Sequence, residues 1–239
     1  MINTRGGQLH CACSGSGPPV VLLHGIQGTS AVWDTVAFGL SDEYTVITPD
    51  LRGRSPSFIP SEPRDYTLDL FAEDFRCVLD MLDEPALVVA WSMGGLVLLE
   101  HLEQHGSERI NAAVLTGTTA FPGTDAQWFT GSTVESITDE AIARARMLQL
   151  APVAEPHAVA ATWWHARDAD YRALLPTVTI PMLIAHGTAD NECPPTHGEF
   201  LAEHLPRARL DMWPEAGHNL MNHDSSRFIQ MIREFATHS

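Results

Sequence analysis

The chain has 239 residues, of which 44% are hydrophobic and 18% are charged, and it carries a formal net charge of -16 at pH 7. This length and composition are typical of a globular protein that buries a sizeable core without disulfides or metals, as one large domain or two small ones. The negative charge argues against nucleic acid and anionic membrane surfaces as partners, and no apolar run reaches the ~18 residues of a membrane span.

The kinds of cationic and sulfur-containing residues narrow the chemistry further. Apart from histidine, every cationic side chain is arginine, which excludes a lysine Schiff base and a lysine-dependent phosphate loop. The four cysteines lack zinc-type spacing with histidines and are expected to be reduced thiols. The first residues contain no apolar stretch of signal-peptide length, so we expect a cytoplasmic protein.

Short apolar runs alternate with segments of helical spacing along most of the chain. The runs predict strands, and the spacings predict helices. Strands are expected at residues 9–13, 20–23, 44–48, 86–89, 112–115, 181–185 and 208–213, and helices at 33–40, 68–82, 96–102 and 228–235. Runs that are apolar throughout are typical of strands buried on both faces of a sheet. The alternation predicts an α/β fold with a doubly wound, mostly parallel sheet.

One segment, residues 118–177, interrupts this alternation. Its spacings predict helices at 138–150 and 155–166, and it contains no convincing strand. We therefore expect a core made of residues 1–117 and 178–239, with residues 118–177 forming a short helical cap insertion over the carboxyl edge of the sheet.

A serine stands on the predicted turn between one buried strand and the helix that follows it. The local sequence is Ala90-Trp91-Ser92-Met93-Gly94, which resembles the G-x-S-x-G nucleophile elbow with alanine in the first position. Small residues are required at such a turn because strand and helix approach closely, and Ala90 adds one methyl group there. The turn forces the Ser92 hydroxyl out of the backbone, where it can act as a nucleophile.

Polar residues also follow other predicted strands. His24 follows the second apolar strand, Asp190 follows the strand before the last, and His218 follows the last strand. In open sheets of this kind, sites form beyond the carboxyl ends of the strands. The sequence therefore places Ser92, Asp190 and His218, in that order along the chain, at one edge of the predicted sheet.

Taken together, these motifs resemble those of the α/β-hydrolase superfamily over nearly the whole chain. The matching segments are the HG-x-x-G loop at 24–28, the D-x-R-G segment at 50–53, the elbow at Ser92, the HG-x-x-D loop that ends at Asp190 and the Gly-His pair at 217–218. The resemblance implies the α/β-hydrolase fold and a serine hydrolase of the esterase or lactonase type.

The resemblance implies residue roles that the chemistry of ester cleavage also requires. Serine is a poor nucleophile without an adjacent base, so His218 is expected to take the Ser92 proton. Asp190 is expected to orient the imidazole and stabilise its charged form. The backbone N–H groups of Ile26 and Met93 are expected to bind the oxyanion. Such a mechanism needs no metal and no organic cofactor.

Other polar residues of these motifs are expected to have supporting roles. His24 is predicted to brace its own loop, and Asp50 and Arg52 are predicted to brace neighbouring turns. Glu192 is the alternative to Asp190 as the acid. Surface or packing roles are expected for the histidines at 101, 105, 165, 197 and 223.

Tryptophan side chains near the predicted site indicate where a substrate binds. The candidate walls of an apolar pocket are Trp91, beside the nucleophile, and Trp128, Trp163 and Trp164 of the insertion. Most aromatic side chains of the insertion are nevertheless expected to attach it to the sheet. The insertion has no basic cluster, which disfavours a large polyanionic substrate. We expect the partner to be a small to medium, uncharged or mildly polar carboxylic ester or lactone.

Other functions are compatible with the same motifs. A carbon–carbon bond hydrolase or a cofactor-free perhydrolase would use the same Ser92, Asp190 and His218. A ligand-binding protein of this fold would show little turnover. Haloalkane dehalogenation is disfavoured, because its nucleophile would be an aspartate where Ser92 stands. The sequence does not indicate an oligomeric state.

Overall fold

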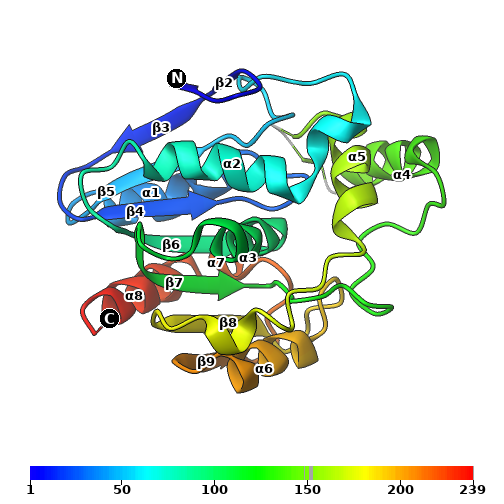
Figure 1. Ribbon diagram of the computed structural model, residues 1–239. Helices are drawn as coiled ribbons and strands as arrows, with labels where there is room; N and C mark the ends of the chain where they lie inside the picture. Colours follow the sequence, from blue (N-terminus) through cyan, green and yellow to red (C-terminus); the bar gives the residue numbers. More distant parts are fainter. Residues whose placement is uncertain (148, 151–152, 239) are drawn as a thin grey trace.

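The computed structural model describes residues 1–147, 149–150 and 153–238, and in this part of the chain the main sheet has seven strands (Figure 1). Their order is β3-β5-β4-β6-β7-β8-β9. Strand β3 is antiparallel to β5, and the other neighbouring strands are parallel. The strands are β3 (Cys11–Ser14), β4 (Pro19–Leu23), β5 (Thr45–Pro49), β6 (Ala86–Trp91), β7 (Ile110–Thr116), β8 (Met182–Gly187) and β9 (Ala208–Trp213). The predicted α/β fold with a mostly parallel sheet is confirmed.

The first expected strand, 9–13, is divided at His10. Its first part belongs to a small antiparallel pair, β1 (Ile2–Asn3) with β2 (Gln8–Leu9), and its second part is β3. The backbone N–H of His10 donates to the hydroxyl oxygen of Ser57 at 2.8 Å. This N–H therefore bonds a side chain instead of a neighbouring strand, and the ladder is interrupted there.

Helices cover both faces of the main sheet (Figure 1). They are α1 (Asp34–Leu40), α2 (Leu68–Leu79), α3 (Met93–His105), α6 (Pro195–His204), α7 (Leu220–His223) and α8 (Ser225–Ala236), with short 3-10 turns η1 (Ser30–Trp33) and η2 (Pro63–Tyr66). Side chains alternate between the two faces of a strand. In β6, Val88 and Ala90 join the core that includes α2 and α3, whereas Leu87 and Val89 join the core that includes α1 and α8.

Local sequence sets where the helices begin and end. Helix α8 begins after Asp224, whose side chain accepts a hydrogen bond from the Arg227 N–H and caps the first turn. Helix α6 was not predicted, and it begins at Pro195, a residue whose fixed φ suits the first turn. No helix in the described part of the chain is long and apolar enough to cross a membrane.

Two longer helices lie between β7 and β8. They are α4 (Val134–Met147) and α5 (Pro156–Ala166), followed by the 3-10 turn η3 (Leu175–Thr177), and the described residues of this segment contain no strand. Helix α4 begins earlier than expected because the Thr133 hydroxyl oxygen accepts a hydrogen bond from the Ser136 N–H at 3.1 Å. Figure 1 shows both helices beyond the carboxyl ends of β4 and β6. Residues 148 and 151–152 of the expected insertion lie outside the described residues.

Candidate active site

Ser92 occupies the single residue between β6 and α3, in a backbone conformation that few side chains adopt. Its φ is 56° and its ψ is -121°. Such conformations cost about 1–3 kcal/mol and persist where the surroundings hold them. Here the Ser92 N–H donates to Thr116 O at 3.0 Å, and the Thr118 hydroxyl donates to Ser92 O at 2.7 Å. The chain therefore reverses sharply at Ser92, as a nucleophile elbow requires.

Close packing explains the small residues around this turn. A Cβ atom added to Gly94 would lie 2.6 Å from the carbonyl oxygen of Leu23 in β4, which is closer than real Cβ contacts come. Ala90 is fully buried in β6, and its methyl group fits there. The glycine of the elbow is thus required at position 94, whereas alanine is accommodated at position 90.

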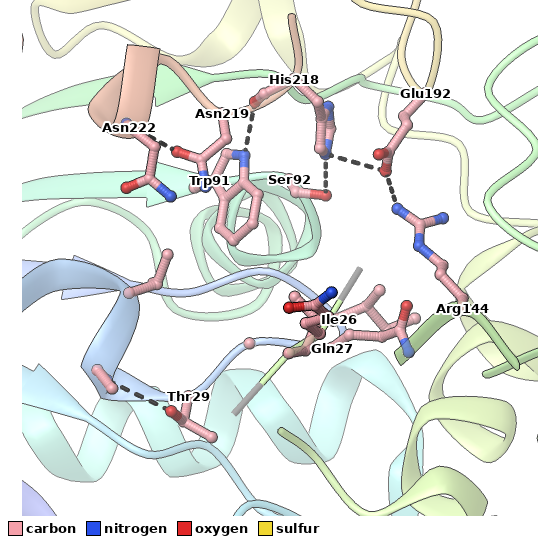
Figure 2. A pocket seen from close by; sticks show the side chains of 15 residues that line it. Ile26, Gln27, Thr29, Trp91, Ser92, Arg144, Glu192, His218, Asn219 and Asn222 are labelled. Atoms are coloured by element: carbon pink, nitrogen blue, oxygen red, sulfur yellow. Dashed lines mark hydrogen bonds and ion pairs between the residues drawn. The ribbon is translucent and has the colours of Figure 1, made fainter. Parts of the chain in front are cut away.

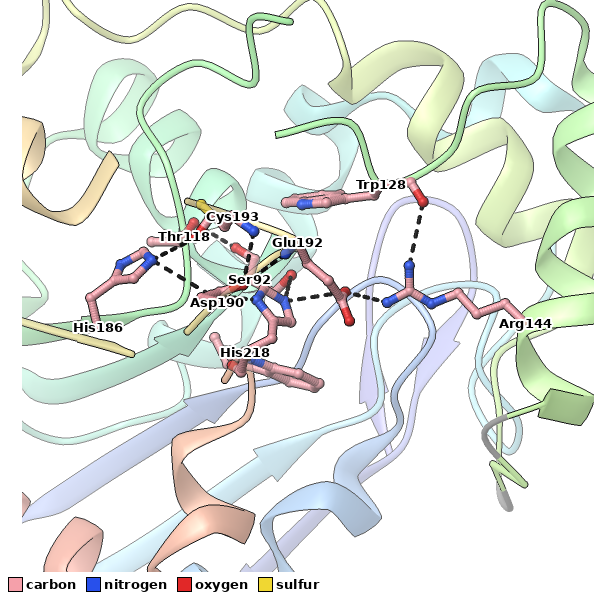
Figure 3. Close-up of polar contacts among 10 residues, drawn as sticks. Ser92, Thr118, Trp128, Arg144, His186, Asp190, Glu192, Cys193 and His218 are labelled. Carbon is pink, nitrogen blue, oxygen red and sulfur yellow. Dashed lines mark hydrogen bonds and ion pairs between the residues drawn. The ribbon is translucent and has the colours of Figure 1, made fainter. Parts of the chain in front are cut away.

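The side chains of Ser92, His218 and Asp190 form a continuous hydrogen-bonded chain (Figure 3). The Ser92 hydroxyl lies 3.0 Å from His218 Nε2, and His218 Nδ1 lies 2.8 Å from Asp190 Oδ2. The three residues come from the β6–α3 turn and from the loops after β8 and β9. With the Nδ1–H donating to Asp190, Nε2 is free to accept the serine proton.

Asp190 is buried and held as an acceptor by its own loop. Its Oδ1 accepts the backbone N–H groups of Glu192 and Cys193, both at 2.9 Å. Burial raises the pKa of the Asp190 carboxyl, but its hydrogen bond and charge interaction with His218, together with the Cys193 N–H and His186, outweigh the effect of burial and leave the pKa below its ordinary value. Asp190 is therefore a carboxylate at neutral pH, as the orienting acid of such a chain must be.

The loop after β4 carries Ile26 and is braced by the buried side chain of His24. Burial lowers the pKa of His24 to about 4, so its ring is neutral. Its Nδ1–H donates to Gly25 O at 2.8 Å, and its Nε2 accepts the Leu51 N–H at 3.1 Å. The predicted bracing role of His24 is confirmed by these contacts.

The same loop is joined from above to the segment that contains α4 and α5. The Gln27 side-chain amide donates to Ala141 O at 3.0 Å, and the Ala154 N–H donates to Gln27 O at 3.1 Å. The residue next to Ile26 is therefore fixed on two sides by the segment between β7 and β8.

Two backbone N–H groups of residues at this site have no hydrogen-bond acceptor among the described residues. Met93 is the first residue of α3, so its N–H has no acceptor inside the helix. The Ile26 N–H bonds no acceptor among the described residues. Ile26 lines the same cavity as Ser92, and Met93 directly follows the serine. These are the donors that the sequence predicts for an oxyanion hole; their use in catalysis stays a prediction.

A cavity of about 380 Å³ opens onto Ser92 and His218 (Figure 2). This volume lies within the range of small-molecule sites. Besides these two residues, its lining consists of Ile26, Gln27, Gly28, Thr29, Ala31, Val32, Trp91, Arg144, Gln149, Leu150, Glu192, Asn219 and Asn222. Among the residues that the structure describes, no group of three His, Cys, Asp or Glu side chains could hold a metal ion.

Comparison with known families agrees with this geometry. Residues 18–152, more than half of the chain, match the family model described as alpha/beta hydrolase fold. The chain belongs to the α/β-hydrolase family.

Several relatives of this α/β hydrolase are named esterases. The pimeloyl-[acyl-carrier protein] methyl ester esterase of Nitrosomonas europaea is 28% identical over 240 residues, which cover 88% of this chain and 92% of that protein. An esterase structure from Rhodococcus sp. superposes with a TM-score of 0.81 at 26% identity, covering 99% and 97% of the two chains. An esterase from Exiguobacterium antarcticum, with a TM-score of 0.87 at 24% identity over 99% and 98%, shows the same fold.

Of the tryptophans expected to form the pocket of this hydrolase, only Trp91 is among the described residues that line the cavity. Its ring N–H donates to His218 O at 2.9 Å. Trp163 is buried against Trp128, with ring centroids 5.1 Å apart, and its N–H donates to Phe129 O at 2.9 Å. Trp164 lies half-buried under the Arg167 guanidinium. The expectation for Trp128, Trp163 and Trp164 is therefore corrected: they pack the segment together or face outward.

A polar wall of the cavity was not predicted as such. Arg144 of α4 forms an ion pair with Glu192, and Glu192 Oε2 lies 3.8 Å from His218 Nε2 (Figure 2). Glu192, the alternative acid, therefore faces the nitrogen that bonds Ser92 and leaves Nδ1 to Asp190. Sequence periodicity offered no signal for Arg144, because it does not reveal which face of α4 meets the site.

Proposed function

We propose that this α/β hydrolase is a serine hydrolase that cleaves a small to medium carboxylic ester or lactone through an acyl-enzyme. The observation that carries the proposal is the hydrogen-bonded chain from Ser92 Oγ to His218 at 3.0 Å and from His218 to Asp190 at 2.8 Å, at the base of the cavity. A serine paired with a base that is itself oriented by a third group is the arrangement required for nucleophilic catalysis.

The proposed reaction begins with acylation of Ser92. Its oxygen attacks the substrate carbonyl carbon while His218 Nε2 takes the hydroxyl proton, and Asp190 stabilises the resulting imidazolium. The carbonyl oxygen becomes an oxyanion and accepts hydrogen bonds from the Ile26 and Met93 N–H groups. The tetrahedral intermediate then expels the alcohol, which receives its proton from His218.

Deacylation repeats these steps with water. His218 takes a proton from a water molecule while the water oxygen attacks the acyl carbon. The N–H groups of Ile26 and Met93 donate hydrogen bonds to the second oxyanion. The intermediate expels Ser92 Oγ, which receives the proton from His218. The products are a carboxylic acid and an alcohol, or a hydroxy acid when the substrate is a lactone.

The character of the cavity wall supports an uncharged or mildly polar substrate. Ala31, Val32 and Trp91 supply apolar surface. The cationic Arg144 is paired with Glu192, so this part of the wall has no net charge. The esterase relative at 28% identity supports the ester class.

We further propose that residues 118–177 act as a cap on the core formed by 1–117 and 178–239. Helix α4 supplies Arg144 to the cavity wall, and Gln27 is bonded to Ala141 and Ala154 of this segment. The entrance to the site is thus bordered by both parts of the chain.

Replacement of the nucleophile tests the proposal. Ser92→Ala should abolish turnover of short p-nitrophenyl esters and of lactones, and it should prevent labelling by a fluorophosphonate probe. Ser226→Ala is the matched control, because Ser226 is exposed on α8 and is not among the residues that line the cavity. Esters and lactones of graded acyl length then define the preferred substrate.

Different results identify the alternatives. Fluorophosphonate labelling without turnover of any ester or lactone would favour a carbon–carbon bond hydrolase or a perhydrolase. No labelling at Ser92 in the folded wild type would favour a ligand-binding protein and contradict the serine hydrolase proposal.

A further inference from the structure

Arg54 is a fully buried cation directly beneath the proposed oxyanion hole. Its side chain has no solvent exposure, and no carboxylate of the described residues lies within ion-pair distance of its guanidinium. Arginine is almost never fully buried unless it is paired. An unpaired cation inside the protein is costly, so its contacts with the surrounding residues are informative.

The guanidinium contacts both residues that carry the proposed oxyanion donors. Its Nη2 donates a hydrogen bond to Ile26 O and lies 3.8 Å from Met93 Sδ. Its Nη1 donates to Arg52 O at 2.7 Å, and its carbon lies 5.6 Å from the centre of the Phe71 ring. One side chain therefore connects the loop after β4 with the first residue of α3.

The contact with Ile26 O restrains the donor on the same residue. The Ile26 N–H belongs to the peptide group of Gly25, whose carbonyl oxygen is held by His24 at 2.8 Å. The Ile26 carbonyl belongs to the next peptide group, and Arg54 holds it. A residue has two soft backbone dihedrals, so fixing the peptide groups on both sides of Ile26 fixes where its N–H points.

The guanidinium keeps its charge at the pH at which an esterase of this type works. Burial lowers the pKa of Arg54 to about 10, so the side chain remains protonated near neutral pH. In the protein interior the effective dielectric constant is far below that of water, and charges there interact more strongly. A cation in this place favours negative charge on an oxygen bound at Ile26 and Met93.

We propose that Arg54 is a positioning residue of the oxyanion hole, which fixes the Ile26 peptide groups and supplies buried positive charge that favours the oxyanion. This inference rests on the proposed serine hydrolase function. It concerns a residue that acts through Ile26 and Met93 and does not itself touch the substrate.

Arg52 provides a matched control from the same loop. It is also a buried arginine, with only 4% of its side chain exposed, but it pairs with Asp74 at 2.7 Å. Its other donors bond Asp65 O and Leu70 O, so its side-chain hydrogen bonds brace η2 and α2. Arg52→Lys and Arg54→Lys are therefore the same chemical change in the same loop, and only the second alters the hydrogen bond to Ile26 O.

The test measures affinity for an oxyanion directly. A trifluoromethyl ketone forms a hemiketal oxyanion with Ser92, whereas the corresponding methyl ketone binds mainly as a neutral carbonyl compound. Arg54→Lys keeps the charge but loses the planar fork, and Arg54→Met loses both. We expect Arg54→Met to lower the affinity for the trifluoromethyl ketone and kcat/KM by the same factor, about 10- to 100-fold.

The remaining measurements separate positioning from a general structural effect. Arg54→Lys should lose about 10-fold in both quantities, and the methyl ketone should bind each variant within about twofold of the wild type. Arg52→Lys should lower the melting temperature without changing the affinity for the trifluoromethyl ketone. If Arg54→Met does not fold, Arg54→Lys, which keeps the charge and most of the volume, decides the question.

Two outcomes overturn the inference. One is a folded Arg54→Lys that binds the trifluoromethyl ketone as tightly as the wild type, and the other is an equal loss of affinity for both ketones. In either case an inactive Ser92→Ala leaves the proposed function intact. Failure of the wild type itself to hydrolyse esters or to bind the trifluoromethyl ketone would instead reject the proposed function, and the inference with it.

Discussion

Glu192 Oε2 lies 3.8 Å from His218 Nε2, the ring nitrogen that faces the Ser92 hydroxyl. The same carboxylate is paired with Arg144 of α4, which contributes a compensating positive charge. The two side chains are partly exposed, at 35% and 23%, so solvent screens their charges.

Substitution of either partner should shift the pH dependence of the rate in opposite directions. Arg144→Gln leaves Glu192 uncompensated and favours the imidazolium, so the acid limb of the kcat/KM profile should move to higher pH. Glu192→Gln should move it to lower pH, with each shift below about one pH unit. Rates measured between about pH 4 and about pH 8 check this. Shifts in the same direction would show that the pair does not act on the imidazole by charge.

Replacement of the orienting acid should be far more damaging than replacement of its neighbour. Asp190→Asn keeps the size of the side chain but does not maintain the required imidazole tautomer, and we expect kcat to fall by about 10⁴-fold. Glu192→Gln should lower kcat by less than about 10-fold, because Glu192 makes no contact with Nδ1. Circular dichroism verifies that both variants fold. Equal losses would assign the acid role to both carboxylates.

Stability should fall as the pH falls below neutrality, because two buried histidines resist protonation. Burial lowers the pKa of His24 and of His101 to about 4 from the ordinary 6.5. The folded-state values are the lower ones, so the unfolded chain binds these protons first. The stability present above about pH 6.5 is lost as the pH falls towards 4, at up to about 1.4 kcal/mol per pH unit for each histidine.

Urea unfolding at several pH values measures this slope. His101→Leu should remove one proton from the linkage and flatten the slope below about pH 6. The control is His223→Gln, because His223 is exposed at the end of α7 and its loss should leave the slope unchanged. A slope that His101→Leu leaves intact would contradict the linkage to this residue.

The two small residues of the elbow should respond differently to substitution. Gly94→Ala places a methyl group 2.6 Å from Leu23 O, so β4 or α3 must shift; we expect activity to fall by more than about 10-fold and the melting temperature to drop. Ala90→Gly restores the motif glycine and should destabilise the strand by about 1 kcal/mol while activity stays within about threefold. Thermal melts and kcat/KM for both variants decide whether the clash is real.

The convergence of the candidate site was predictable because sheet topology determines it. Ser92, Asp190 and His218 follow the carboxyl ends of β6, β8 and β9, and parallel strands place those ends at one edge. The strands themselves were recognisable from apolar runs that are buried on both faces. The hydrogen bonds among Ser92, His218 and Asp190 were expected, and the catalytic role of these residues stays a prediction.

The residues that form the cavity wall could not be predicted from the sequence, because packing decides which side chains of α4 and α5 reach the cavity. Helix α5 is apolar on most faces, so its sequence did not reveal that Trp163 points into the core and Trp164 towards Arg167. Successive helical residues are rotated by about 100°, so adjacent tryptophans cannot share one surface. Arg144 was missed for the same reason, since nothing in its spacing distinguishes a cavity-facing arginine from a solvated one.

The two hydrogen bonds of Gln27 have a consequence for how substrate enters. Gln27 follows Ile26 directly and is bonded to Ala141 of α4 and to Ala154 beyond that helix, so a movement of α4 away from the loop would break a hydrogen bond next to a proposed oxyanion donor. Under the proposed mechanism, a conformation with α4 farther from the loop would be more open to substrate and less able to stabilise the oxyanion. A substrate too large for α4 to return to this position would then bind without reacting, so substrate size would be selected when the site closes.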